Sequence, residues 1–265
     1  MANGKMRIRA LRCLAAAAAL SAFVWSVGSL ARYGREARES QTALETMQAL
    51  AVEGAAAPIG PEEGESSLSE PSEEGPPIQV DLDKAREVNE DIVAWIYCQD
   101  TPISFPVLRS RDNQDYLDRL PDGTRNANGS IFLDFRNAPD FSGRNSILYG
   151  HNMKSGAMFA SITRYRDPAY YETHPTLYLF CGEETYRVAL FAAGTVSADS
   201  PLYGEDAEAA EAAIAALLRS SPFSSGVTPL PEDRLLTLST CSYAYQDARF
   251  VLMGRLVPLA QEASS

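Results

Sequence analysis

Histidine and cysteine are both scarce in this chain of 265 residues, which contains two histidines and four cysteines. No Cys-x-x-Cys pair occurs, and with two histidines a zinc site would need an unusual set of ligands. We therefore expect no metal and no cofactor. An imidazole that acts as a base must come from His151 or His174.

Positive charge is also limited, because 23 Lys and Arg residues stand against 35 Asp and Glu residues, for a formal net charge of −12. Nucleic-acid-binding proteins usually carry a clustered basic surface, so the composition argues against a nucleic-acid partner. The excess of acidic residues also disfavours contact between the C-terminal bulk of the chain and anionic lipid headgroups.

One uncharged run, residues 13–31, is long enough to cross a bilayer, and it follows the basic residues Lys5, Arg7, Arg9 and Arg12. At about 1.5 Å per residue, such a helix spans roughly 28 Å, close to the thickness of the hydrocarbon layer. The basic flank predicts that residues 1–12 stay in the cytoplasm and that the rest faces outward. The alternative is a signal peptide cleaved after Ser29-Leu30-Ala31, but the run exceeds the usual signal core, which favours an uncleaved single-pass anchor.

Residues 32–77 are expected to hold a juxtamembrane helix and then an acidic linker. The helix, at 36–50, has three apolar side chains along one side: Leu44, Met47 and Leu50. Residues 51–77 contain five Pro, four Gly and seven Glu but neither Lys nor Arg, too little apolar content for a core. This linker is either a tether that gives the outer domain reach or a spacer with no length requirement.

Residues 78–258 form the expected folded domain, followed by a tail at 259–265. Asp81–Tyr97 is expected to be an amphipathic helix with an apolar face of Leu82, Ala85, Val88, Ile92 and Trp95. A second long helix is predicted at Glu205–Arg219, which is Ala-rich, with acidic residues early and Arg219 last.

The remaining apolar segments of this domain are short and are bounded by Gly, Pro, Asn and Asp, as strands usually are. Such a series favours an antiparallel-rich barrel or sandwich. The predicted strands are residues 103–108, 130–134, 145–149, 176–181, 186–193, 235–240 and 249–257.

A thiol and a positive charge come together within residues 235–257, which read as a strand, a short polar connection and a second strand. Cys241 ends the first strand on the face of Thr237 and Ser239, because side chains alternate along a strand. Arg249 opens the return strand, so a hairpin places both side chains at one end of the sheet. A nearby cation favours the nucleophilic thiolate. The alternative is that Cys241 is a small buried hydrophobe.

The odd number of cysteines in this part of the chain also points to Cys241. Three cysteines, Cys98, Cys181 and Cys241, lie outside the predicted membrane segment. Even if Cys98 and Cys181 formed a disulfide, one thiol would remain, and we assign it to Cys241. The spacing does not decide whether the other two pair, although we expect both to be reduced and at least partly buried.

Of the two histidines, His151 is the better candidate for a base. It follows the predicted strand 145–149 and Gly150, so its imidazole stands at a strand end. His174 precedes Pro175, which favours extended backbone and a surface connection. Because no reactive residue flanks His174, we expect it to be structural.

With these segments in hand, the chain resembles the sortases, the cysteine transpeptidases of Gram-positive cell surfaces. The Thr-Leu-Ser-Thr-Cys run at 237–241 matches the sortase signature, and Gly150-His151 lies upstream of it. The resemblance covers roughly residues 80–257 and is to class B in particular, through Asn89–Ile96, Phe105–Val107, Asn113–Leu117, Gly129–Asn137 and Met158–Phe159. It implies a mainly β fold, a closed barrel of about eight strands with an N-terminal helix and a long helical insert before the cysteine strand.

The resemblance also implies an activity, that of a membrane-anchored transpeptidase on the extracellular face. Its donor would be a secreted protein with a C-terminal sorting signal, cleaved after Thr, and its acceptor an amine of a peptidoglycan peptide or a pilin. Cys241 would form a thioester, His151 would exchange protons with the leaving and incoming amines, and Arg249 would hold the oxyanion. The sequence does not give the pentapeptide of the sorting signal. It also does not say whether the product is an anchored wall protein or a pilus.

Four further residues are expected to bind substrate. Asn113 and Leu117 match positions that line the groove of class B sortases, and Ser239 matches the signature serine. Tyr203, just ahead of the second predicted helix, is expected to contribute a wall. The alternatives are a core leucine at 117 and an exposed aromatic at 203. Ser242 stands where other class B enzymes place an acid, which leaves acceptor preference open.

Two other functional classes compete with this interpretation. A papain-like peptidase would use water as acceptor, but it places its cysteine ahead of its histidine, the reverse of the order here. A non-catalytic surface-binding module on the same fold is the other, since fold does not fix function. The joint presence of Cys241, His151 and Arg249 disfavours it.

Overall fold

The computed structural model describes residues 2–54, 75–242 and 244–259, with side chains from residue 18 onward. The chain divides into two compact units, Met1–Thr42 and Ala43–Ser265. Most of the predicted acidic linker and of the predicted tail lies outside the described residues.

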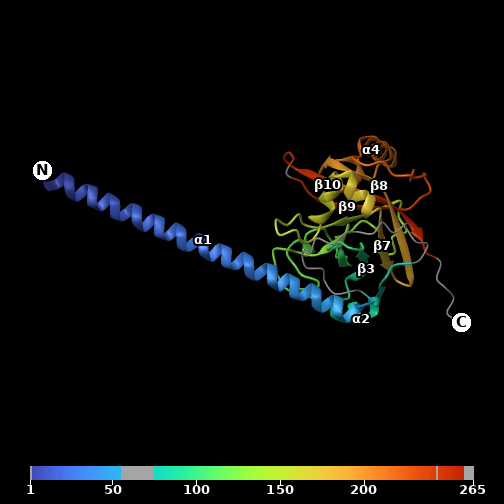
Figure 1. Cartoon of the computed structure of the whole chain (residues 1–265), viewed down its shortest axis with the longest axis horizontal. Coiled ribbons are helices and arrows are strands. Elements are labelled where there is room, and N and C mark those ends of the chain that lie inside the picture. The colour runs from blue at the N-terminus through green and yellow to red at the C-terminus, as the bar shows by residue number, and fades with distance from the viewer. Residues whose placement is uncertain (1, 55–74, 243, 260–265) are drawn as a thin grey trace. The chain divides into compact units, whose positions relative to one another are not determined.

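The first unit consists of most of helix α1 (Ala2–Ala51), which continues without interruption into the second unit (Figure 1). The helix predicted at 36–50 is therefore the last part of a much longer one. Six large apolar side chains stand exposed between residues 20 and 30 of α1: Leu20, Phe23, Val24, Trp25, Val27 and Leu30. Among the residues that the structure describes, no helix is long and apolar enough to span a membrane. The first part of the predicted anchor, residues 13–17, lies outside the described side chains.

The last turns of α1 belong to the core of the second unit. Met47 and Ala51 are buried there, together with residues of helix α2 (Leu82–Val88) and of the barrel wall, and Leu44 is partly buried. The side chain of Gln48 donates a hydrogen bond to the backbone carbonyl of Ser104. Leu50, which was predicted to share the apolar side of this helix, is instead 39% exposed.

A two-stranded ladder joins the chain on either side of residues 55–74. β1 (Val52–Glu53) pairs antiparallel with β2 (Gln79–Val80), and the amide of Asp81 donates to the carbonyl of Ala51 at 2.8 Å. The second compact unit therefore begins at Ala43, ahead of the predicted domain start at residue 78.

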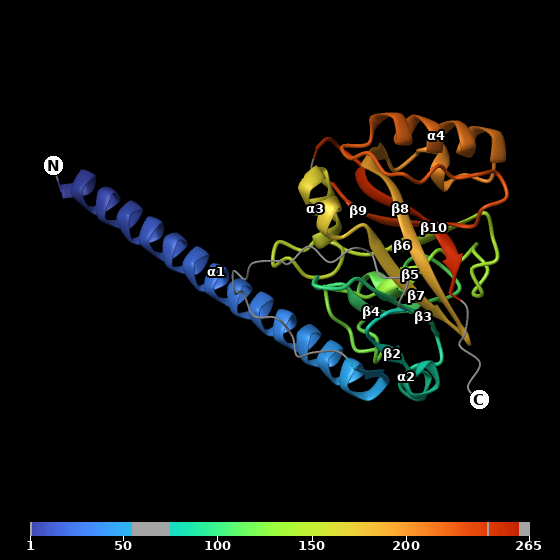
Figure 2. The same ribbon diagram turned by 45° about the vertical axis from the view of Figure 1, so that its right-hand side comes forward.

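The second unit is built on a closed barrel with the strand order β10-β8-β7-β3-β4-β5-β6-β9, so the predicted eight-stranded barrel is confirmed (Figures 1 and 2). Two neighbouring pairs, β4–β5 and β6–β9, are parallel and the rest are antiparallel. The strands are β3 (Ile92–Tyr97), β4 (Ser104–Leu108), β5 (Ile131–Leu133), β6 (Asn145–Tyr149), β7 (Thr176–Cys181), β8 (Glu184–Ser197), β9 (Leu235–Cys241) and β10 (Ala248–Pro258).

The predicted helical insert is confirmed as α4 (Ala207–Ser220). It begins where the side chain of Asp206 accepts a hydrogen bond from the amide of Ala209, a standard N-cap. Ile214 and Leu217 bury its apolar face in a cluster that includes Phe191 of β8. Figures 1 and 2 show α4 lying on the outside of the barrel near β8. The short helices are α2 (Leu82–Val88), α3 (Pro168–Thr173), and the 3-10 turns η1 (Asp115–Leu117), η2 (Ser161–Arg166) and η3 (Pro201–Tyr203).

The single helix predicted at Asp81–Tyr97 is wrong. Only α2 is helical, and the rest of that segment forms strand β3. Asn89 ends the helix, since its side chain accepts a hydrogen bond from the amide of Asp91 and donates to the carbonyl of Pro121. The run that follows is rich in β-branched and aromatic residues and packs on both faces, so its apolar spacing fits a central strand as well as a helix.

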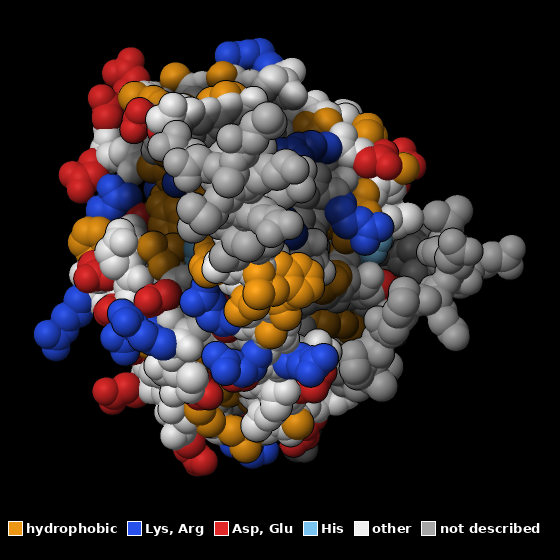
Figure 3. Space-filling view, turned by 90° about the vertical axis from the view of Figure 1, so that its left-hand side faces the viewer, with side chains coloured by type: hydrophobic (Ala, Val, Ile, Leu, Met, Phe, Trp, Pro, Cys, Tyr) orange, Lys and Arg blue, Asp and Glu red, His pale blue; other side chains and the backbone are white. Residues whose placement is uncertain are grey.

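Charged side chains on the surface are mixed in sign. Among the described side chains on the face shown in Figure 3, Lys and Arg are interspersed with Asp and Glu. That face therefore carries both signs of charge, although the chain as a whole is acidic.

Candidate active site

Cys241 and Arg249 are direct cross-strand partners in the antiparallel β9–β10 ladder. The ladder continues one step further, where the amide of Ser242 donates to the carbonyl of Ala248 at 2.8 Å. The prediction that a hairpin would bring thiol and guanidinium to one end of the sheet is therefore confirmed. Cys241 is partly exposed, which excludes a fully buried structural thiol.

β9 lies between β6 and β10, and all its residues before Cys241 are buried. Its polar side chains are satisfied by neighbours: the hydroxyl of Thr237 donates to Asn145 Oδ1, and that of Thr240 donates to the carbonyl of Gly150, each at 2.7 Å. This rigid strand places the thiol at the point where the chain leaves the sheet.

His151 enters from the neighbouring parallel strand. β6 and β9 are in register with Tyr149 opposite Ser239, so His151 and Cys241 each lie two residues beyond that pair. The two segments stay in contact past the strand end, because the side chain of Asn152 donates to the carbonyl of Cys241 at 2.8 Å. Imidazole, thiol and guanidinium therefore come from three adjacent strands, β6, β9 and β10.

A backbone carbonyl holds the imidazole of His151. Its Nε2 lies 2.7 Å from the carbonyl oxygen of Leu117, at the end of η1. A carbonyl oxygen can only accept, so Nε2 carries the proton in this arrangement. The side chain of Leu117 is 37% exposed, which excludes the alternative of a core leucine.

Gly150 allows the close packing just before His151. A Cβ at this position would lie 2.8 Å from Cδ2 of Phe159 and closer still to the side chain of Ile131. Both of those neighbours are buried, so only glycine fits without displacing the core.

His174 ends helix α3, and its contacts are local. Its ring stacks on Tyr170 with 4.3 Å between centroids, and Nδ1 lies 2.8 Å from the hydroxyl of Thr173. These contacts support the expected structural role.

Cys98 and Cys181 are free thiols, with Cys98 buried and Cys181 partly buried, as expected. Burial raises the pKa of each thiol to about 11, so both stay protonated near neutral pH. Neither is suited to act as a nucleophile. Among the described residues, no cluster of three or more His, Cys, Asp or Glu side chains is arranged to hold a metal ion.

The other predicted substrate residues fall into two groups. The hydroxyl of Tyr203 shares a 2.8 Å hydrogen bond with that of Ser239, two residues before Cys241 on β9. Burial raises the pKa of Tyr203 to about 12, so its hydroxyl stays neutral, and its partial burial excludes a simply exposed aromatic. Asn113 lies elsewhere in the sequence, just before η1, and bonds to Asp134 and Phe135.

Comparison with known proteins decides the family. A sequence model of the sortase domain matches residues 96–257. Sortase B of Listeria monocytogenes is 35% identical over 187 residues, which cover 68% of this chain and 75% of that protein. Sortase B of Staphylococcus aureus is 29% identical over 188 residues, covering 69% and 77%. The chain is a class B sortase.

Solved structures agree with this assignment. Sortase B from Bacillus anthracis in complex with AAEK1 matches with a TM-score of 0.66 and 27% identity, over 84% of this chain and 98% of that one. The S. aureus sortase B–substrate complex matches with a TM-score of 0.62 and 29% identity, over 67% and 85%. This sortase is therefore a cysteine transpeptidase of a family associated with the cell surface and the cell wall.

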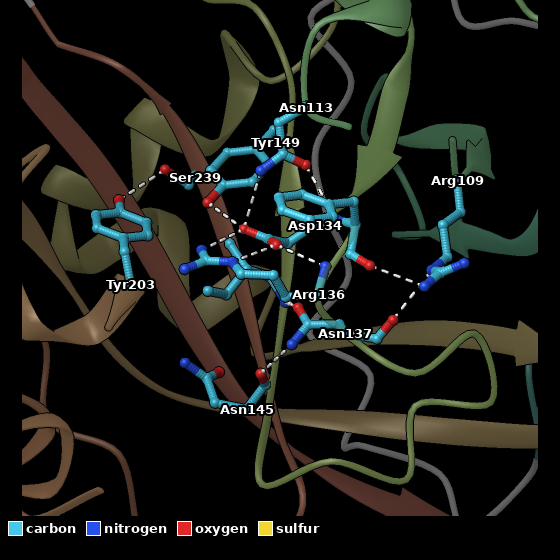
Figure 4. A network of polar contacts seen from close by, with 11 residues as sticks. Arg109, Asn113, Asp134, Arg136, Asn137, Asn145, Tyr149, Tyr203 and Ser239 are labelled. Atoms are coloured by element: carbon cyan, nitrogen blue, oxygen red, sulfur yellow. Dashed lines mark hydrogen bonds and ion pairs between the residues drawn. The ribbon is translucent and has the colours of Figure 1, made fainter. Parts of the chain in front are cut away.

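The structure adds residues to this sortase site that sequence reasoning did not single out. Asp134 follows β5 and is surrounded by donors that include Arg136 and Tyr149 (Figure 4). The sequence did offer a signal, because Asp134 stands directly after a buried strand inside one of the segments that resemble class B sortases. Its partners Asn113 and Tyr149 come from other segments and cannot be found by spacing.

Arg166, at the end of η2, is a second guanidinium near the thiol end of β9. Its Nη2 donates to the hydroxyl of Ser242 at 3.1 Å, and its Cζ lies 4.6 Å from the ring centroid of Phe250. Ser242 lies one residue past the Cys241–Arg249 pair on the loop side, whereas Phe250, which is opposite Thr240, lies one residue before the pair within the sheet. The Arg166 side chain therefore contacts the hairpin on both sides of that pair.

Proposed function

We propose that this sortase cleaves the C-terminal sorting signal of a secreted protein after Thr and transfers that protein to an amine of a peptidoglycan peptide or a pilin. The observation that carries the proposal is the cross-strand pairing of Cys241 with Arg249, with His151 two residues beyond the end of the neighbouring strand β6. Substrate contact is assigned to four further residues: Asn113, Leu117, Ser239 and Tyr203.

The first half-reaction forms a thioester. The Cys241 thiolate attacks the carbonyl carbon of Thr, and the negative charge that develops on the carbonyl oxygen is stabilised by the guanidinium of Arg249. Arg249 is suited to this role because it remains charged and presents forked donors. As the C–N bond breaks, the imidazolium of His151 gives a proton to the departing amine.

The second half-reaction regenerates the enzyme. The acceptor amine attacks the thioester carbonyl and gives a proton to the imidazole of His151, and the C–S bond breaks to release the thiolate. With Nε2–H directed at the carbonyl of Leu117, Nδ1 is the nitrogen that exchanges protons with the two amines. The new amide joins donor and acceptor, and no cofactor takes part.

A donor peptide and an amine test this proposal in the full-length protein, held in detergent micelles. An amide product supports transpeptidation, an acid product alone indicates a peptidase that uses water, and no turnover indicates a binding module. Cys241→Ala should abolish turnover, whereas Cys181→Ala, the matched control at a partly buried thiol, should retain it. Turnover by Cys241→Ala would contradict the assigned nucleophile.

We also propose that residues 13–31 anchor this sortase as a single-pass helix, with residues 1–12 in the cytoplasm and the catalytic domain outside. The uncharged run, its basic flank and the exposed apolar side chains of α1 support this. Protease added to intact cells should digest the catalytic domain and spare an N-terminal tag. A mature N-terminus beginning after residue 31 would instead show a cleaved signal peptide.

A further inference from the structure

Asp134 is a buried carboxylate beside the proposed substrate residues. Its side chain is 1% exposed, and Arg136 supplies three of its donors: the backbone amide and Nε to Oδ1, and Nη2 to Oδ2 at 2.7 Å. Burial by itself would raise the pKa of this carboxyl, but the hydrogen bonds from Arg136 and Tyr149, together with the charge of Arg136, outweigh burial and lower it. Asp134 is therefore a fixed negative charge at neutral pH.

The first of its remaining contacts fixes the amide of Asn113. Nδ2 of Asn113 donates to Asp134 Oδ2 at 3.1 Å, and Oδ1 accepts from the amide of Phe135 at 3.0 Å (Figure 4). Because a carboxylate can only accept and a backbone amide can only donate, the Asn113 amide has one orientation here. The carboxylate thus determines where Asn113 offers its second N–H and its second lone pair.

The other contact reaches Ser239 through two tyrosines. The hydroxyl of Tyr149 donates to Asp134 Oδ2 at 2.9 Å, and its ring stacks on Tyr203 at 6.2 Å between centroids. Tyr203 in turn shares its hydroxyl hydrogen bond with Ser239. Figure 4 shows this sequence of side chains running from Asp134 to β9, the strand that carries Cys241.

We propose that Asp134 is a positioning residue for the donor peptide: its carboxylate sets the orientation of Asn113 and of the Tyr149–Tyr203–Ser239 wall. The inference rests on the proposed function, because it assigns these side chains to the donor site. Asp134 acts through its neighbours and takes no part in bond making. Its loss should therefore weaken donor binding more than it slows the reaction of bound donor.

Two variants test this by the split between KM and kcat. Asp134→Asn replaces the carboxylate with a neutral amide. Tyr149→Phe removes only the hydroxyl that donates to the Asp134 carboxylate, and it leaves the ring stack with Tyr203 in place. Each should raise KM for the donor peptide about tenfold while kcat changes less than threefold, the loss expected for a hydrogen bond to a charged group. Tyr149→Phe keeps the test valid if Asp134→Asn does not fold.

Tyr186→Phe is the matched control. Tyr186 is also a buried tyrosine whose hydroxyl donates to a carboxylate, that of Glu184, but it lies at the start of β8, opposite Pro258. Arg249 pairs with Val196 near the other end of the same strand. Tyr186→Phe should leave KM within twofold of the wild type. An equal rise in all variants would indicate general loosening and would overturn the proposal.

A double-mutant cycle separates positioning from independent effects. If Asp134 acts through Tyr149, the variant with both Asp134→Asn and Tyr149→Phe should raise KM no more than Asp134→Asn alone. A KM that rises by the product of the two single effects would contradict the linkage.

A readout without turnover keeps this inference distinct from the proposed function. The side-chain amide protons of Asn113, assigned by NMR from their loss in Asn113→Ser, should exchange slowly in the wild type and at least tenfold faster in Asp134→Asn. Unchanged exchange would refute the positioning role whether or not the peptide is cleaved. If the wild type cleaves no sorting signal but exchange responds, the proposed function fails and the role of Asp134 in holding Asn113 stands.

Discussion

Nε2 of His151 lies 2.7 Å from the carbonyl oxygen of Leu117, so a backbone atom of η1 orients the proposed catalytic imidazole. This carbonyl has room only because residue 129 is a glycine. Gly129 has φ +60, and a Cβ there would lie 2.6 Å from the Leu117 oxygen and 2.7 Å from that of Tyr116. A side chain at position 129 would therefore move the acceptor that holds His151.

Gly129→Ala should lower kcat about tenfold, because a displaced carbonyl leaves the imidazole less well oriented. The matched control is Gly182→Ala, since Gly182 has φ +59 but a Cβ added there would meet nothing within 4 Å. Gly182→Ala should lose about 1 kcal/mol of stability from the left-handed backbone, and Gly129→Ala should lose more, because its Cβ also meets two carbonyl oxygens. Steady-state kinetics and urea unfolding check this, and equal kcat values in the two variants would contradict the role of the carbonyl.

Arg166→Gln should slow acylation of Cys241 severalfold, because it removes the contact that joins Ser242 to the Phe250 ring. Single-turnover formation of the thioester with a donor peptide measures acylation, and the rate of Cys241 alkylation by iodoacetamide as a function of pH reports the reactivity of the same thiol. Arg164→Gln is the control: Arg164 lies in the same turn and packs its guanidinium over Tyr170 at 4.3 Å, with no such contact to the hairpin among those described. Similar alkylation profiles for both variants would remove Arg166 from the site.

Acid should destabilise the fold partly through Asp134. Its folded-state pKa is lowered below the ordinary value of 3.8, so the unfolded chain binds more protons as the pH falls through that range. The stabilisation is present above about pH 4 and is lost as the pH falls through the folded-state pKa. Asp134→Asn should therefore show a shallower fall in unfolding free energy below pH 4, and a slope equal to that of the wild type would contradict the lowered pKa.

The end of α1 should contribute to the stability of the catalytic unit. Met47 is 3% exposed, so Met47→Ala should lower the free energy of unfolding by about 2 kcal/mol or more. Leu50, three residues on, is 39% exposed, and Leu50→Ala should cost much less. Thermal and urea unfolding of both variants test whether this part of α1 packs against the barrel.

The pairing of β1 with β2 gives a related expectation for the linker. Because Val52 lies opposite Val80, the ends of residues 55–74 are already held together. Replacing these residues with a short Gly-Ser turn should change neither the unfolding temperature nor turnover of a soluble peptide. Wall attachment in cells should also be unchanged, as expected for a spacer without a length requirement, because a segment whose ends are paired does not set the distance between α1 and the barrel. A loss of attachment in this variant would instead support the tether interpretation and contradict the pairing.

The sequence predicted the hairpin well because its signals are local. Alternation along residues 235–241, an eight-residue step to Arg249 and the strand that ends at Gly150 each follow from the periodicity of neighbouring residues. Strand pairing then brings these ends together. The barrel class and α4 were likewise accessible from short apolar runs and a helix-favouring composition.

The predictions were wrong or incomplete for residues whose structure depends on packing between distant parts of the chain. Trp95 follows Val88 by seven residues and Ile92 by three, which are helical spacings, yet it belongs to β3, because burial on both faces gives a strand the same apolar run. Two of the donors to Asp134 come from Asn113 and Tyr149, on other segments, so no spacing rule connects them with the carboxylate. The last turns of α1 were likewise assigned to a juxtamembrane helix, because only the folded structure shows what Met47 packs against.

The proposed mechanism requires Cys241 to carry the donor as a thioester, with Arg249 beside it on the next strand. Intact-mass spectrometry can detect this species when the protein is mixed with a sorting-signal peptide in the absence of an amine and quenched in acid. We expect an adduct with the mass of the peptide up to Thr, mapped to Cys241, released by hydroxylamine and strongly reduced in Arg249→Lys. An adduct on another residue, or amide product formed without any adduct, would contradict the mechanism.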